Sequence, residues 1–410
     1  MLFSRSGVFL SSCLLSLTAV VGRAAALPPM LDLPGSGGEV AQIDFARLPV
    51  LHGEHAVVSR PDAPWGFRLH SYLAFHEGRF WCMWSHGTAR EDLPLQHVRY
   101  ATSADGLTWS EAREIAGPSL KEDWRYIARG FWVRDGRLLA LASHDEVYDA
   151  PTGRKRLFGP GLELRAWEWS AATTTWRDVG VVARDAINNF PPRKVPGRDE
   201  WLMILRDHRR AVYGLVGGVT SISDWTRVEL ANAQKASGFS PEEPEWWPLV
   251  DGRLLGLYRD NSGSMRLFRA VSADGGRTWS PPEKTNFPGA TAKFYALRTS
   301  CGFYVLVSNA NPAKPAQRIP LCLATSDDGV TFTRLAALPI PAQPEDGPLD
   351  ADGKRILGRG YQYPHVIEQG EAVFVAYSRN KESIEVVRVS LDELERLRSA
   401  GGAEALQKHP

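Results

Sequence analysis

Six polar residues stand where six predicted strands begin, and their side chains could do chemistry on an anionic ligand. They are Arg68, Arg129, Asn189, Glu243, Lys293 and Tyr363. Guanidinium groups bind carboxylates through charge-assisted hydrogen bonds that can be bidentate. A tyrosine hydroxyl can act as a nucleophile when a neighbouring base takes its proton. Two more arginines, Arg259 and Arg318, lie where other strands end or begin, so the set is polar and mostly basic, unlike a core.

These side chains can meet only if the strands that carry them surround one point. The stretch 242–279 shows the repeating unit, in which the apolar runs WWPLV, LLGLY and MRLFRAV are separated by Gly/Asp turns and close in SADGGRTW. Such runs predict consecutive antiparallel strands. The closing SxDGGxTW is an Asp box, a hairpin whose Asp and Ser/Thr side chains bond turn backbone groups above a packed Trp. One blade of a β-propeller has this layout.

The same pattern recurs along the chain at a blade-scale spacing of roughly 50 to 70 residues. Asp105, Asp274 and Asp328 stand in clear boxes, 170–176 keeps only the Ser-to-Trp spacing, and 221–225 is more eroded. One more three-strand set over 363–390 completes six blades. The sequence therefore predicts an all-β fold, a six-bladed propeller of four-stranded antiparallel blades, whose innermost strands converge on one channel mouth.

Some strand limits follow from the apolar runs. The innermost strands of blades two, three and five are predicted over 130–133, 192–195 and 292–297. A strand near 56–59 is expected to complete the last blade and close the ring. The leucine spacing of the tail predicts a short surface helix with no core to fill.

The N-terminus resembles a targeting segment. Arg5 supplies a positive n-region, 8–21 is an apolar stretch too short to span a bilayer comfortably, and 24–26 are small alanines. We therefore expect a signal peptide over 1–26, a single propeller domain over 27–410, and a secreted or periplasmic protein without a membrane span. A lipoprotein signal ending at Cys13 is the alternative.

The net charge and the cysteines limit the partners, disulfides and metal sites that the chain is expected to have. The net charge of +1 gives no reason to expect nucleic acid as a partner. The mature chain would keep Cys82, Cys301 and Cys322, so at least one thiol is free. Cys301 and Cys322 could face each other across a hairpin, or be buried strand cysteines. No CxxC or HExxH occurs, so neither a metal site nor a cofactor is expected.

From about residue 65 onward the chain resembles the exo-sialidases, or neuraminidases. The sequence 67–70, FRLH, takes the place of the family's YRIP motif, and Asp92 lies on the loop before the first Asp box. Glu243 precedes a DGR turn by eight residues and Arg259 follows it by eight, as in the family. Arg318 follows an Asn-Pro loop, and Tyr363 opens the last blade.

The resemblance implies a retaining exo-glycosidase that releases a terminal acidic sugar, most simply sialic acid, from an acidic glycan or sialoglycoconjugate. It implies Tyr363 as nucleophile, Glu243 as its base and Asp92 as acid/base. The substrate carboxylate would be held by Arg68, Arg259 and Arg318, whose field would lower the pKa of the tyrosine. His70, Arg129, Asn189, Lys293 and Trp246 are candidate pocket lining.

Several neighbours compete for these roles. Glu242 or Glu245 could replace Glu243, Glu91 could replace Asp92, and Tyr361 could lie nearer the channel than Tyr363. The sequence also departs from the family. Residues 377–379 read Tyr-Ser-Arg where a glutamate usually supports the first arginine, His70 replaces a proline, and Pro364 follows the tyrosine.

Two other functions fit the same residues. A propeller polysaccharide lyase acting on uronic acids needs a His or Tyr base beside an arginine, which His70 and Tyr363 could supply. A non-catalytic glycan-binding propeller would bind without turnover. The fold alone does not choose between them.

Overall fold

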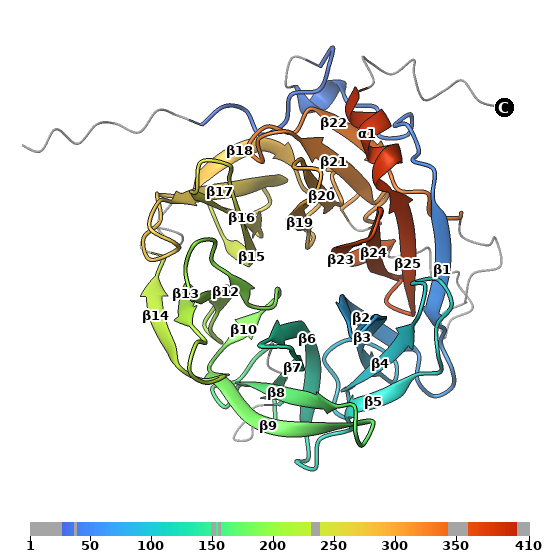
Figure 1. Ribbon diagram of the computed structural model, residues 1–410, viewed down its shortest axis with the longest axis vertical. Helices are drawn as coiled ribbons and strands as arrows, with labels where there is room; N and C mark the ends of the chain where they lie inside the picture. The colour runs from blue at the N-terminus through green and yellow to red at the C-terminus, as the bar shows by residue number, and fades with distance from the viewer. Residues whose placement is uncertain are drawn as a thin grey trace, which may run out of the picture.

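The computed structural model describes residues 27–36, 39–148, 153–154, 157–230, 238–315, 317–342 and 360–399. Within these residues, six antiparallel sheets surround a common axis, with β2, β6, β10, β15, β19 and β23 nearest the centre of Figure 1. This confirms the predicted all-β, six-bladed propeller. The expected signal peptide, 1–26, lies outside the described residues.

The blades are numbered in chain order, and the strands of each are given from the axis outward. Blade 1 contains β2 (Phe67–His76), β3 (Arg79–Gly87), β4 (His97–Ser103) and β5 (Arg113–Ala116). Blade 2 contains β6 (Trp124–Arg134), β7 (Arg137–Glu146), β8 (Glu163–Ser170) and β9 (Thr175–Arg184). Blade 3 contains β10 (Ile187–Asn188), β11 (Arg193–Lys194), β12 (Trp201–Arg206), β13 (Val212–Gly217) and β14 (Trp225–Glu229).

The remaining blades follow the same order. Blade 4 contains β15 (Pro241–Pro248), β16 (Leu254–Asp260), β17 (Arg266–Ser272) and β18 (Glu283–Pro288). Blade 5 contains β19 (Tyr295–Arg298), β20 (Tyr304–Ser308), β21 (Cys322–Ser326) and β22 (Arg334–Ala337). Blade 6 contains β23 (Tyr361–Gln369), β24 (Ala372–Arg379), β25 (Ser383–Ser390) and β1 (Glu54–Ser59). A short 3-10 helix, η1 (Val40–Gln42), and the helix α1 (Leu391–Ser399) lie outside the blades.

The innermost strands differ from the sequence predictions in three blades. In blade 3 the predicted strand over 192–195 is shortened to β11, and β10 also pairs with β12 before it. The two short strands are separate because Pro191 and Pro192 between them have no N–H to donate to a ladder. In blade 2, β6 begins well before 130. In blade 5, β19 begins only at Tyr295, so Lys293 lies on the segment that leads into it.

The Asp boxes are built as their sequence indicates. The Asp274 carboxylate accepts hydrogen bonds from the backbone N–H groups of Arg277 and Thr278, at 3.0 and 2.9 Å. The Trp279 indole donates to the Gly276 carbonyl at 2.9 Å. In the eroded copy, Trp225 still donates in the same way to Ile222, at 2.8 Å. The tryptophan bond to the turn thus persists where the aspartate of the box is absent.

The two ends of the described chain meet in blade 6. Strand β1 pairs antiparallel with β25, as predicted, so the N-terminal segment supplies the outer strand of the last blade (Figure 1, blue beside red). Helix α1 corrects the expectation of a helix without a core. Its Leu391, Leu394 and Leu397 are buried against strands of blades 5 and 6. The helix therefore caps an apolar seam.

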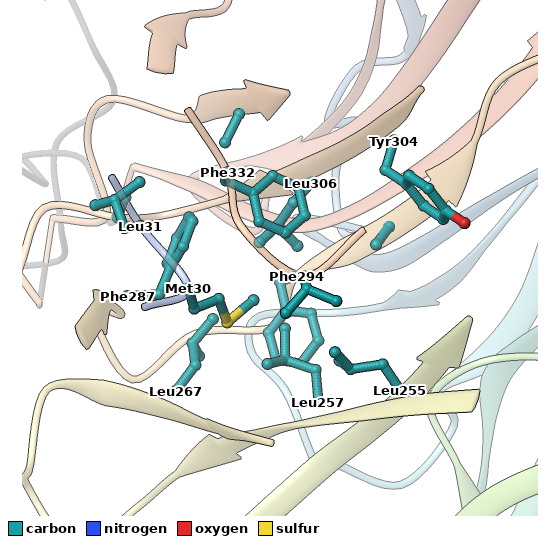
Figure 2. Close-up of a cluster of buried hydrophobic side chains, with 14 of the residues drawn as sticks. Met30, Leu31, Leu255, Leu257, Leu267, Phe287, Phe294, Tyr304, Leu306 and Phe332 are labelled. Atoms are coloured by element: carbon teal, nitrogen blue, oxygen red, sulfur yellow. The ribbon is translucent and has the colours of Figure 1, made fainter. Parts of the chain in front are cut away.

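The hydrophobic core lies between neighbouring blades. Figure 2 shows one such cluster, in which Leu257 of blade 4 faces Phe294 and Leu306 of blade 5. Met30 and Leu31 from the N-terminal segment close its outer side, and both backbone N–H groups donate to the Asn286 side chain. Each buried side chain of this size contributes roughly 1.5–3 kcal/mol. Blade-to-blade packing therefore fixes the ring that positions the channel mouth.

The cysteines of the described chain are all free. Cys82 and Cys322 are buried, while Cys301 is exposed in the turn between β19 and β20. Of the two readings that the sequence left open, a Cys301–Cys322 disulfide is therefore excluded for this structure.

Candidate functional site

A cavity of about 260 Å³ lies where the inner strands begin, and most of the expected site residues line it. These are His70, Asp92, Arg129, Asn189, Glu243, Arg259, Arg318 and Tyr363. Two larger hollows, of about 650 and 700 Å³, contain none of these residues. The smaller central cavity is therefore the candidate site.

Local backbone irregularities aim three of these side chains into the cavity. Strands β2, β15 and β23 each have a register shift, and His70, Glu243 and Tyr363 lie within the three shifts. All three residues have left-handed φ angles, 56°, 44° and 56°. A β-bulge redirects a side chain out of the normal alternation, and such strain persists only where the surroundings hold it.

Tyr363, Glu243 and Arg259 form a chain of polar contacts. Arg259 Nη1 donates to Glu243 Oε2 at 2.8 Å, and the Tyr363 hydroxyl lies close enough to the same carboxylate to hydrogen-bond it. Burial by itself would raise the pKa of Glu243, but Arg259 and Tyr363 outweigh burial and lower this pKa to about 2. Glu243 is therefore a buried carboxylate beside a phenol.

The pKa of Tyr363 moves in the direction opposite to the expectation. Burial raises it well above 10, Glu243 and Glu91 add to the rise, and Arg259 and Arg318 only partly oppose it. The arginine field does not win because the desolvation of the partly buried phenol and the two carboxylates that it faces together outweigh it. Tyr363 is therefore neutral in the free protein.

Arg318 has no carboxylate partner among the described residues. Its guanidinium donates to the side-chain oxygen of Gln362 and the backbone carbonyl of Thr291, both at 3.1 Å. Both acceptors are neutral, and burial lowers the pKa of Arg318. A mostly buried cation held only by neutral acceptors is costly unless an anion completes it.

Arg68 does not join this group, so the expected three-arginine clamp is not assembled. Its side chain does not line the cavity. It pairs with Asp62 and donates to Ser59 Oγ at 2.8 Å and to the Trp65 carbonyl at 2.6 Å. Asp62 thus supplies the acid that the sequence lacks at 377–379. The bulge after Leu69 gives His70, rather than Arg68, the place facing the channel.

The expected acid/base residue, Asp92, is at the cavity rim with a side chain that is 19% exposed. Arg125 Nη1 donates to its Oδ1 at 2.5 Å. Arg125 is also shared with buried Asp145, at 2.9 Å, so it does not serve Asp92 alone. Asp92 therefore faces the cavity from a supported position.

Its competitor, Glu91, is held in a different network. Glu91 pairs with Lys381, and His70 Nε2 lies 3.3 Å from Glu91 Oε1. Burial would raise the pKa of Glu91, but His70 and Lys381 outweigh it and lower this pKa. The His70 ring in turn meets the Tyr363 ring edge-on, with centroids 4.7 Å apart. Glu91 therefore positions His70 against the tyrosine.

The structure also separates the other competitors. Glu242 lines the cavity but pairs with Arg206 at 2.6 Å. Glu245 pairs with Arg193 at 2.5 Å and lies outside the cavity lining. Tyr361 packs against Tyr377, with ring centroids 5.6 Å apart, and also lies outside that lining. Trp246 belongs to the core between blades 3 and 4.

Lys293 is buried beside the cavity rather than lining it. Its ammonium lies 4.2 Å from the centre of the Tyr72 ring, 4.8 Å from that of Phe190 and 5.7 Å from that of Tyr363. Its Nζ has no hydrogen-bond partner in the described chain. Burial lowers the pKa of Lys293 to about 7, although Glu243 and Glu245 oppose the shift.

We expect Lys293→Met to raise the free energy of unfolding, most strongly at and below pH 7. The folded-state pKa of about 7 lies below the ordinary lysine pKa of 10.5, so the unfolded chain binds more protons between these values. Wild-type stability therefore rises with pH across that window, and the advantage of the variant shrinks by at most about 1.4 kcal/mol per pH unit. Urea unfolding of both proteins from pH 6 to 10 measures this. A gap that stays constant with pH contradicts it.

Sequence reasoning did not single out Arg206, Arg210, Asn261, Lys381 or Phe158, all of which line the cavity. One signal was present, since the second strands of blades 3 and 4 both end in Arg-Asp, at 206–207 and 259–260. No group of three His, Cys, Asp or Glu side chains in the described residues is arranged to hold a metal ion. Within the same residues, no helix has the length and apolarity to cross a membrane.

Comparisons with known proteins agree with this architecture. The family model of the BNR repeat-like domain matches residues 216–375. No curated protein matches the sequence. A solved sialidase superposes with a TM-score of 0.55 at 18% identity, covering 84% of this chain, which spans about a third (34%) of that sialidase.

Two further solved structures are similar at comparable distance. The leech intramolecular trans-sialidase, complexed with 2,7-anhydro-Neu5Ac, has a TM-score of 0.61 and 13% identity, with 85% of this chain and 71% of that chain covered. A protein of unknown function from Dyadobacter fermentans has a TM-score of 0.61 and 14% identity, with 83% and 99% covered. The chain is therefore a six-bladed β-propeller with the fold of the sialidases, and part of it matches the BNR repeat-like domain.

Proposed function

We propose that the protein is a secreted or periplasmic, sialidase-like retaining exo-glycosidase that hydrolyses a terminal acidic sugar, most simply sialic acid. The observation that carries this proposal is the convergence of Tyr363, Glu243, Arg259 and Arg318 on one cavity. Sialidases are the glycosidases in which a tyrosine, rather than a carboxylate, is the nucleophile.

Arg318 would receive the substrate carboxylate. Its acceptors in the free protein are neutral oxygens, so an incoming anion gains a charge-assisted hydrogen bond. Arg259 lies beside it but is already paired with Glu243, and its buried Nε has no partner among the described residues. A substrate carboxylate that reaches both guanidiniums would accept a hydrogen bond from Arg259 Nε and a charge-assisted hydrogen bond from Arg318.

Tyr363 and Glu243 would then make the covalent bond. A carboxylate nucleophile would be repelled by the substrate anion, whereas a neutral phenol is not. As Tyr363 Oη attacks the anomeric carbon, its proton passes to Glu243, and the bond to the leaving oxygen breaks. Since the pKa of Tyr363 is high and that of Glu243 low, this transfer occurs only in concert with bond formation.

Asp92 would protonate the leaving oxygen and then activate water. It stands at the rim, where an aglycone would leave, and Arg125 holds it there. Water then attacks the anomeric carbon of the tyrosyl intermediate and releases the sugar with retained configuration. As the bond to Tyr363 breaks, Glu243 returns the proton to the tyrosine oxygen.

One observation favours a second candidate, a uronate lyase. The His70 ring lies against Tyr363, and the displaced Arg68 leaves fewer arginines than the sialidase plan requires. A histidine or tyrosine base beside Arg318 could abstract the proton next to a uronate carboxylate.

Product analysis distinguishes these functions. The purified protein is incubated with an aryl α-sialoside, its methyl ester and a polyuronate, and products are followed by proton NMR and ultraviolet absorbance. We expect the acid to be hydrolysed with the α-anomer formed first, the ester to be turned over far more slowly, and no unsaturated product. Ultraviolet-absorbing product from the polyuronate would establish the lyase instead. Binding of the acidic glycans without any product would identify a glycan-binding propeller.

A further inference from the structure

The side of the cavity contributed by blades 2 and 3 holds a second group of cations. Arg129 begins this group from β6, and Arg206 and Arg210 add to it from the end of β12 and the turn after it. Arg318 belongs to blade 5, and β6 lies across the ring from β19 of that blade (Figure 1). The cavity therefore has cationic groups on two sides.

Arg129 is buried without a carboxylate partner in the described chain. It is 2% exposed, and its guanidinium donates to Ser143 Oγ at 2.8 Å and to Asn189 Oδ1 at 3.1 Å. Both acceptors are neutral. Arg125 and Arg206 lie near enough to act on it by charge repulsion. Arg129 therefore resembles Arg318, because each is a largely buried cation held only by neutral acceptors, and the two lie on different walls of the cavity.

Arg206 has unmade hydrogen bonds. It is 5% exposed and pairs with Glu242 through Nη2 at 2.6 Å, but its Nε and Nη1 atoms bond nothing in the described residues. Its place in blade 3 matches that of Arg259 in blade 4, since each lies within the last two residues of a second strand and precedes an aspartate. Glu242 and Glu243 thus pair with equivalent arginines of adjacent blades.

An aromatic ring covers this second group. The Phe158 ring centre lies 5.1 Å from the Arg206 guanidinium carbon, 5.5 Å from that of Arg125 and 5.9 Å from that of Arg129. Such contacts offset part of the repulsion between the guanidiniums. Arg129 and Arg206 are themselves buried, so an anion bound against them would interact in a low dielectric.

We propose that Arg129, Arg206 and Arg210 form a second anion subsite, so that the ligand carries a second acidic group held away from the first. This rests on the proposed function only in placing the first acidic group on Arg318. The second group has two chemical sources, a further acidic substituent on the same sugar or the carboxylate of a neighbouring sugar.

The two cationic groups lie on different walls of the cavity, because β6 and β12 carry Arg129 and Arg206 whereas blade 5 carries Arg318. Tyr363 acts on both Arg318 and Arg129, so it lies within reach of each group. A ligand that spans the two groups would therefore pass near the tyrosine.

Calorimetric binding to the full chain tests the proposal with three probes. Gluconate has one carboxylate, galactarate has two on one six-carbon sugar acid, and digalacturonate has one on each of two sugars. We expect at least one diacid to bind about 10- to 100-fold more tightly than gluconate, as one additional charge-assisted contact allows. Which diacid is preferred identifies the source of the second group. If neither diacid binds more tightly than gluconate, or if none of the three probes binds, the second subsite is refuted.

Variants assign the preference to residues. Arg129→Gln should reduce the diacid preference to about twofold, the statistical value for two equal carboxylates. Arg210→Gln changes an exposed side chain and should reduce the preference in a protein whose folding is not at risk. Arg134→Gln is the matched control, because Arg134 is also buried on β6 but donates to the backbone carbonyls of Gly218 and Val219.

The outcomes separate this proposal from the proposed function. If gluconate binds and Arg318→Ala abolishes that binding, but diacids gain nothing, only the second subsite fails. If diacids are preferred and Arg129→Gln removes the preference, but Arg318→Ala leaves gluconate affinity unchanged, the second subsite stands and the clamp at Arg318 fails. If Arg134→Gln lowers the preference as much as Arg129→Gln does, the effect is structural and the subsite is refuted.

Discussion

Replacement of Tyr363 by phenylalanine is expected to lower kcat by about 10³-fold or more while leaving the affinity for an acidic sugar within a few-fold of wild type. In the proposed mechanism the hydroxyl makes the covalent bond, and loss of a nucleophile removes an interaction made only during the reaction. The ring stays in place because His70 packs against it and Lys293 lies over it. The proposal assigns carboxylate capture to Arg318 and Arg259, which the substitution does not change.

Tyr361→Phe is the matched control. It lies two residues away on β23, yet it packs on Tyr377 and Arg379 and does not line the cavity. We expect its turnover to remain near wild type. Steady-state kinetics with equilibrium binding of the released sugar measures both effects. Wild-type turnover in Tyr363→Phe, or an equal loss in both variants, excludes Tyr363 as the nucleophile.

Replacement of Arg318 by alanine should lower kcat/KM on an acidic substrate by about one to two orders of magnitude. Its guanidinium is held by the neutral oxygens of Gln362 and Thr291, so it is free to bind the substrate anion. A charge-assisted hydrogen bond is worth about 1.5–3 kcal/mol, which sets the size of the loss. Arg318→Lys should recover activity only in part, since an ammonium cannot form the bidentate fork.

The methyl ester of the same substrate separates charge from structure. On the ester, wild type and Arg318→Ala should have similar kcat/KM, because the anion that Arg318 recognises is gone. Arg298→Ala is the control within blade 5, since Arg298 is exposed and donates to the Gly302 carbonyl. The clamp is refuted if wild type turns over ester and acid equally, or if Arg318→Ala behaves as Arg298→Ala does.

The fold could be predicted because each repeating unit is marked by residues that lie close together in the sequence. The Asp box needs particular side chains at particular turn positions, so Asp105, Asp274 and Asp328 mark blades without any knowledge of distant contacts. The positions of Glu243 and Arg259 follow in the same way, because a turn at Asp251 joins the two strands that carry them. A hairpin register brings the ends of its strands together.

Arg68 shows where this reasoning fails. The alternation of apolar and polar residues along β2 gives no indication of the bulge after Leu69. Because of this bulge, His70 rather than Arg68 faces the channel. The acid that holds Arg68 is Asp62, which precedes the strand and belongs to no repeated motif. Phe158 could not be predicted either, since it comes from a connection between β7 and β8 and its contacts cross to another blade.

Arg206 could have been found by aligning the blades with one another. The sequences WLMILRD and LLGLYRD occupy the same place in blades 3 and 4, so the role considered for Arg259 applies by position to Arg206. The pairing of these arginines with Glu242 and Glu243 depends on the bulge in β15, which sends adjacent glutamates to different partners. That step needs the three-dimensional structure.

The pairing of β1 with β25 has a consequence for biosynthesis. The Glu54–Arg388 ion pair joins residues 334 positions apart, across the point where the ring closes. Tyr363 belongs to the blade translated last, and its contact with His70 of blade 1 spans this closure. A ribosome-bound chain that lacks β25 lacks the partner of β1, so the ring has not yet closed around these two residues.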